Sequence, residues 1–97
     1  MRRSDVHAAL MRLAPKIPAF EAGAIVDHAM TSRGLASSSA ETAAWLSLVA
    51  FVRHTMTDYD DLMAEGYDHS AARYFVVGEM TGILEGWGVR RPLIEEE

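Results

Sequence analysis

The sequence predicts an all-α protein, a single compact bundle of about five helices in which the third helix is central. Apolar residues recur at helical rather than alternating spacing, and prolines and glycines separate the chain into short segments. A chain of 97 residues is long enough for one modest core. We therefore expect one helical domain over residues 1–97, with frayed tails at residues 1–3 and 92–97.

The first two helices are delimited by prolines. Ser4 is expected to cap the first helix, which stops before Pro15 because proline restricts the residue that precedes it. Pro18 is expected to open the second helix, and Gly34 is placed at its C-terminal cap. The apolar stripe of this second helix consists of Ala22, Val26, Ala29 and Met30.

The third helix follows a polar loop, LASSSAET, at residues 35–42. Ser38 or Ser39 is expected to cap a helix that reaches about Met56. One side of this helix is apolar and the other side has mostly small residues, so other helices should surround it. The apolar side consists of Trp45, Leu48, Val49, Val52 and Met56, and the opposite side of Ala43, Ser47, Ala50 and His54.

The fourth helix is short. Thr57 is the expected cap, and Asp58 and Asp60 fall in the first turn, where the helix dipole favours negative charge. Gly66 is the expected C-terminal stop. This segment therefore forms a junction between the third helix and the fifth.

The fifth helix is expected to begin after a cap at Asp68 or Ser70 and to end at Gly88. Its core stripe consists of Val76, Met80, Ile83, Leu84 and Trp87. Arg73 falls on the same stripe, and a buried charge without a partner is costly, so an anionic partner is expected. The nearest carboxylates lie in residues 58–61.

Composition narrows the classes of function. The absence of cysteine excludes disulfides and thiolate metal sites, and the net charge of -5 weighs against a nucleic-acid module. Residues 42–52, the longest uncharged run, are too short for the roughly 20 residues of a membrane span. The N-terminal residues lack the apolar core of a signal peptide, so the expected compartment is the cytoplasm.

The candidate site is the stretch RHTMTDYDDL, residues 53–62, which is dense in ionisable groups. We interpret it as a capped and ion-paired junction rather than a reactive centre, with no catalytic residue, cofactor or metal ligand assigned. The cluster consists of Arg53, His54, Thr57, Asp58, Tyr59, Asp60 and Arg73. The alternative is a metal-dependent or hydrolytic site on His54 and Asp58, with His28 as a third ligand, but a cap at Thr57 would break the required helical spacing.

A second candidate is a glycine stripe on the fifth helix. Gly78, Gly82 and Gly86 lie with Phe75 opposite the core stripe. A glycine inside a helix costs about 0.5 to 1 kcal/mol relative to alanine, so three of them indicate that a backbone approaches closely. That backbone belongs either to another helix of the same chain or to a second copy in a homodimer.

The segment RHTMTDYDDLMAEG and the following SAAR resemble the domain-of-unknown-function family 2293. The shared pattern consists of Arg53, His54, Thr57, Asp58, Tyr59, Asp60, Leu62, Gly66, Ala72, Arg73 and Trp87. A weaker likeness in PAFEAGAIVDHA extends it to Pro18 and includes His28. The resemblance implies a small helical domain, often part of longer proteins, and no activity. A basic, glycine-containing segment after the family's second helix is reduced here to a single basic residue, Arg33.

Taken together, these features predict a non-enzymatic interaction or assembly module that binds itself, as a homodimer, or another protein. The second hypothesis is a nucleic-acid-associated helical domain. That hypothesis depends on Arg33, Arg53, Arg73, Arg90 and Arg91. The third is the metal-dependent or hydrolytic site described above, and a membrane partner is not expected.

Overall fold

The computed structural model describes residues 1–94 and confirms the all-α prediction, with five α-helices and one short 3-10 helix in that range. The elements are α1 (Arg3–Leu13), α2 (Ala19–Thr31), the 3-10 helix η1 (Arg33–Leu35), α3 (Ala40–Met56), α4 (Tyr59–Ala64) and α5 (His69–Gly86). Within this part of the chain, no helix is long and apolar enough to cross a membrane.

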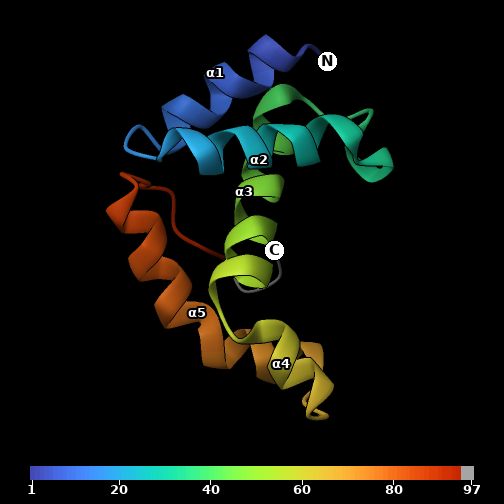
Figure 1. Ribbon diagram of the computed structural model, residues 1–97, viewed down its shortest axis with the longest axis vertical. Helices are drawn as coiled ribbons and strands as arrows, with labels where there is room; N and C mark the ends of the chain where they lie inside the picture. Colours follow the sequence, from blue (N-terminus) through green and yellow to red (C-terminus); the bar gives the residue numbers. More distant parts are fainter. Residues whose placement is uncertain (95–97) are drawn as a thin grey trace.

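The central element is α3, as predicted, because it contacts each of the other four α-helices. In Figure 1 it runs vertically through the middle of the molecule, with α1 and α2 packed at its upper half. The α4 helix lies below its lower end, and α5 runs along its side. After α5 the chain turns back toward α3, where Leu93 packs against the core.

Several predicted helix boundaries are confirmed by their hydrogen bonds. The Ser39 hydroxyl accepts a hydrogen bond from the backbone N–H of Thr42 at 3.1 Å, and this bond caps α3. The Asp68 carboxylate caps α5 by accepting from the N–H of Ala71 at 2.9 Å. The chain leaves α4 and α5 through glycines with positive φ, 106° at Gly66 and 86° at Gly88.

Three predicted caps are wrong. The cap position of α4 is Asp58 rather than Thr57, and it has no side-chain cap hydrogen bond. Ser4 lies inside α1, which begins at Arg3 without a side-chain cap. The second helix ends earlier than predicted, at Thr31, because the chain becomes extended at Ser32. Gly34 therefore lies in η1 rather than at a helix cap, and this 3-10 turn takes up the start of the predicted loop.

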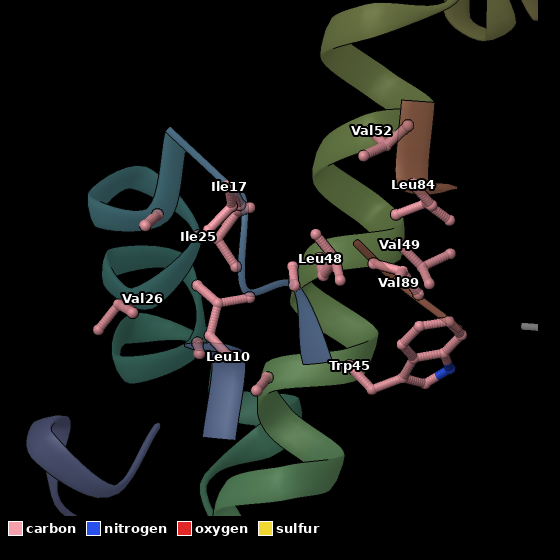
Figure 2. Close-up of a cluster of buried hydrophobic side chains, with 14 of the residues drawn as sticks. Leu10, Ile17, Ile25, Val26, Trp45, Leu48, Val49, Val52, Leu84 and Val89 are labelled. Carbon is pink, nitrogen blue, oxygen red and sulfur yellow. The ribbon is translucent and has the colours of Figure 1, made fainter. Parts of the chain in front are cut away.

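The hydrophobic core surrounds the middle of α3. Figure 2 shows Leu10 and Ile25 pointing toward Leu48 from α1 and α2, whereas Val49 lies with Val89 on another side of α3. These side chains are buried, together with the indole of Trp45. The largest fully buried side chains are Trp45, Leu10, Ile25, Leu48, Met80, Val6, Val26, Val49 and Val52.

Two residues of the predicted apolar stripes lie outside this core. Met30 is 36% exposed and Met56 is 38% exposed. Each residue lies in the last turn of its helix, because α2 ends at Thr31 and α3 ends at Met56 itself. The stripes were predicted from helical phase alone, which does not show where the neighbouring helices stop.

Contacts join both end segments of the described chain to the rest of the fold, and the α1–α2 turn to the end of α5. The α1–α2 turn contacts the end of α5 through a hydrogen bond from Lys16 N–H to the Trp87 carbonyl at 2.9 Å. Arg3, which was expected to fray, begins α1 and forms an ion pair with Asp27 at 2.6 Å. Of the expected C-terminal tail, Leu93 packs on the core, and residues 95–97 lie outside the described residues.

Candidate functional site

The junction between α3 and α4 is organised by Thr57. Its backbone is extended, so α3 ends at Met56. The Thr57 hydroxyl donates a hydrogen bond to the Arg53 carbonyl in the last turn of α3 and accepts one from the Tyr59 N–H at 3.2 Å in α4. One side chain therefore satisfies backbone groups of both helices, and the helix breaks between His54 and Asp58.

The break changes the partner of His54. Its Nδ1 lies 2.6 Å from an Asp60 carboxylate oxygen, and both side chains are about half exposed to solvent. The proposed metal pair of His54 with Asp58 is therefore wrong, because the first turn of α4 brings Asp60 rather than Asp58 against the imidazole. Within residues 1–94, no three histidine or carboxylate side chains are grouped so that they could hold a metal ion.

Tyr59 connects α3, α4 and α5. Its ring is buried, with 3% of its surface exposed, and its hydroxyl lies 2.7 Å from Nδ1 of His69 in the first turn of α5. The Arg53 guanidinium carbon is 5.6 Å from the ring centre, and the His54 ring meets the same ring edge-on at 5.2 Å. The sequence placed Tyr59 in the cluster, but it did not identify His69 as its partner.

The two arginines of the cluster face the end of the described chain. Arg53 is 7% exposed, and together with Arg73 it lines a cavity of about 10 Å³ next to Leu93. This volume is at the lower limit for one water molecule, so the cavity does not accommodate a ligand. In the described part of the chain, no ion pair joins either arginine to Asp58 or Asp60, contrary to the predicted pairing.

His28, the proposed third metal ligand, lies elsewhere. Its Nδ1 is 3.0 Å from the hydroxyl of Ser47, which is fully buried in α3. This bond satisfies the polar group that α3 carries on its small-residue side, and it joins α2 to α3. His28 therefore has a packing role, and it does not complete a metal site with His54.

The glycine stripe of α5 is open. A Cβ atom added at Gly78, Gly82 or Gly86 would meet no neighbouring heavy atom within 4 Å. The interpretation that these glycines pack against another helix of the same chain is therefore wrong for the described residues. The three positions instead form a continuous exposed surface along one side of α5.

Exposed aromatic rings extend this surface toward the start of α5. Phe75 is 57% exposed, Tyr74 is 70% exposed and Tyr67, in the preceding turn, is 44% exposed. The Phe75 ring contacts both tyrosines, with ring centres 5.3 Å from Tyr67 and 5.8 Å from Tyr74. We call the surface formed by Tyr67, Tyr74, Phe75, Gly78, Gly82 and Gly86 the outward face. Its tyrosines were missed in the sequence, although Tyr74 is adjacent to the predicted Phe75.

Residues 9–88 match a family described as an uncharacterized conserved protein, DUF2293. The chain belongs to this family. The match confirms the resemblance seen in the RHTMTDYDDL segment, and it extends from the second half of α1 to the turn after α5. No curated protein and no solved structure matches the chain. The function of this DUF2293 domain therefore has to be inferred from its own surface.

The arginines of the nucleic-acid hypothesis lie in separate segments of this DUF2293 domain. Arg33 lies in η1, whereas Arg53 and Arg73 line the small cavity next to Leu93. Arg90 and Arg91 follow α5 and line another cleft. A nucleic-acid interface requires an accessible basic surface, and Arg53, which is 7% exposed, contributes little to one.

Proposed function

We propose that this DUF2293 domain is a non-enzymatic interaction module that assembles with a second copy of itself through the outward face of α5. The observation that carries this proposal is the coincidence of two features on one face. Three glycines have open space above them, and three exposed aromatic rings lie toward the N-terminal end of the same face. Neither feature is needed to fill the core of the monomer.

The energetics favour covering this face. Burial of apolar surface contributes about 25 cal/mol per Å², and aromatic side chains each present a large area of it. Glycines have no side chain, so the backbone of a second helix can approach α5 closely at these positions. Contiguous exposed apolar patches on soluble domains commonly mark interaction sites.

A second copy is the simplest partner for a face of this kind. In a two-fold symmetric dimer the same patch is used on both subunits, so one helix face is sufficient to form the whole interface. Gly82 lies near the centre of the glycine stripe, and Phe75 is about 10 Å from it along the helix axis. An antiparallel crossing at Gly82 would place the Phe75 ring of each copy near the turn that follows the other α5, because α5 ends only four residues after Gly82.

Size-exclusion chromatography with light scattering tests the proposal. At high protein concentration, the wild type should have twice the 10.7 kDa mass of one chain. Gly82→Leu should be monomeric because its side chain would hold the two helices apart. Gly23→Leu is a matched control, since Gly23 lies in α2 and also has open space at its Cβ, so this variant should dimerise like the wild type. A wild type that stays monomeric at every concentration would refute the proposal.

The nucleic-acid alternative has weaker support because its arginines are dispersed and the chain has a net charge of -5. Its test is the binding of generic DNA or RNA as a function of salt concentration. Binding through phosphate contacts weakens steeply as salt increases.

The hydrolytic alternative required His54 and Asp58 to lie together. It has weaker support because His54 pairs with Asp60 instead.

A further inference from the structure

A cleft with a volume of about 660 Å³ lies where the α1–α2 turn meets the chain that follows α5. Its charged lining residues are Arg12, Lys16, Arg90, Arg91 and Glu85. Four positive charges and one negative charge give this cleft a formal charge of +3, on a chain whose net charge is -5. The charge of the cleft is therefore opposite in sign to that of the whole chain.

The two segments that supply these charges are held together by backbone contacts. The Lys16 N–H donates to the Trp87 carbonyl at 2.9 Å and so joins the two segments. Within the second segment, Val89, which is buried, donates its N–H to the Leu84 carbonyl at 3.0 Å and fixes the turn after α5. A Cβ atom at Gly88 would lie 3.0 Å from Pro15, so the two segments are in close contact there. Basic residues 74 positions apart in the sequence, Lys16 and Arg90, thus line one fixed cleft.

Two of the basic side chains form no ion pair in the described part of the chain, although Glu85 lines the same cleft. Within residues 1–94, neither Lys16 nor Arg90 takes part in an ion pair. Arg12 pairs with Glu41 at 3.3 Å, but both side chains are well exposed, and exposed pairs of this kind contribute little and exchange readily. Arg91 places its guanidinium carbon 4.3 Å from the centre of the Trp45 ring, so its position is set by a buried residue.

Helix dipoles explain only part of this arrangement. The C-terminal ends of α1 and α5 both point toward the cleft, and a basic residue such as Arg12 in a last turn is favoured there. Lys16, Arg90 and Arg91 lie just beyond these ends, where the negative end of a dipole favours a cation and opposes an anion. A phosphate in the cleft would therefore be held by the basic side chains themselves, against the two dipoles.

We propose that this cleft binds the phosphate groups of a small phosphorylated ligand, with Lys16 and Arg90 as the main contacts. Guanidinium and ammonium groups are the side chains that bind phosphate oxygens most strongly. The volume also falls within the range of about 300 to 1,000 Å³ that is typical of small-molecule sites. The carboxylate of Glu85 in this cleft repels anions, so its removal should increase the affinity for phosphate.

The test is a calorimetric titration of the full chain with inorganic pyrophosphate at low salt. The wild type should bind one equivalent, and Lys16→Gln and Arg90→Gln should each weaken binding by about tenfold, the effect of losing one hydrogen bond to a charged group. Glu85→Gln should tighten binding by about threefold because it removes a like charge. Arg33→Gln, which loses the same charge outside the cleft, should bind as the wild type does.

Three results would overturn the proposal. The first is a wild type that does not bind pyrophosphate, and the second is an equal loss of affinity in Arg33→Gln and Arg90→Gln, which would indicate a general charge effect. The third comes from parallel titrations with a 20-nucleotide oligothymidylate and with phosphatidic-acid vesicles. Saturable binding of either one without pyrophosphate binding would assign the surface to nucleic acid or to lipid. Circular dichroism of each variant establishes that it is folded, and two independent contact residues keep the test valid if one variant is not.

Discussion

The two faces of α5 are built from different residues and differ in their exposure to solvent. The inner face buries Val76, Met80 and Leu84 against the core, whereas the outward face has open glycines and exposed rings such as Phe75. A glycine inside a helix costs about 0.5 to 1 kcal/mol, and on the outward face no contact within the described chain offsets that cost. The inner face therefore accounts for the stability of the monomer, whereas no contact within the described monomer accounts for the composition of the outward face.

The largest effect that separates the two faces is expected from Met80→Ala. Met80 is 1% exposed, and truncation of a buried methionine lowers the free energy of unfolding by about 2 to 5 kcal/mol. Phe75→Ala removes a larger side chain from the outward face, but it should lower that free energy by only about 0.5 kcal/mol. Urea denaturation at low protein concentration measures both changes. Equal losses in the two variants would show that the outward face is part of the monomer core.

A smaller effect is expected where the start of α5 meets α4. Tyr59→Phe removes the hydroxyl that lies 2.7 Å from His69, and it should lower the free energy of unfolding by about 1 kcal/mol. Tyr74→Phe is the control, because Tyr74 lies on the outward face and is 70% exposed, so its hydroxyl is accessible to water. Thermal denaturation should show a lower midpoint for Tyr59→Phe alone. Identical midpoints for the two variants would show that the hydroxyl of Tyr59 does not help to hold α5 in place.

Gly82→Ala is expected to act in the opposite direction. The added methyl group would meet no atom within 4 Å, and alanine is the better helix former, so the free energy of unfolding of the monomer should rise by about 0.5 to 1 kcal/mol. The measurement is urea denaturation at a concentration where only monomer is present. A decrease would mean that another part of the chain covers Gly82.

The smallest effect is expected for the ion pair of His54 and Asp60. Both side chains are about half exposed, so the coupling between them should be below about 0.5 kcal/mol. A double-mutant cycle with His54→Gln and Asp60→Asn measures this coupling directly. A coupling above about 2 kcal/mol would contradict the interpretation of this pair as a weak surface contact and would reopen the site as a reactive centre.

Local features of the fold could be predicted from the sequence because they depend on neighbouring residues. The caps at Ser39 and Asp68 and the glycine turns at Gly66 and Gly88 each follow from short-range backbone chemistry. The central position of α3 followed from its composition, since a helix with apolar residues on one side and small residues on the other requires neighbours on both.

The pairing of side chains could not be predicted in the same way. His54 pairs with Asp60, and Tyr59 with His69, only because the chain breaks at Thr57 and sets the direction of α4. The surroundings of Arg73 depend on the chain after α5 turning back toward α3, which helical periodicity does not encode. The exposure of the α5 glycines could not be predicted either, because their spacing in the sequence is the same whether a helix covers them or not.

Cysteine cross-linking at position 82 tests the central claim most directly. The chain contains no cysteine, so Gly82→Cys introduces a single thiol at the proposed crossing point of two α5 helices. A disulfide requires the two Cα atoms to lie within about 7 Å, a separation that close helix packing at this position provides. Under mild oxidation, a non-reducing gel should show a covalent dimer of Gly82→Cys forming much faster than one of Gly23→Cys, whose thiol would lie on α2. Equal rates for the two variants would contradict the assembly of this domain through the outward face.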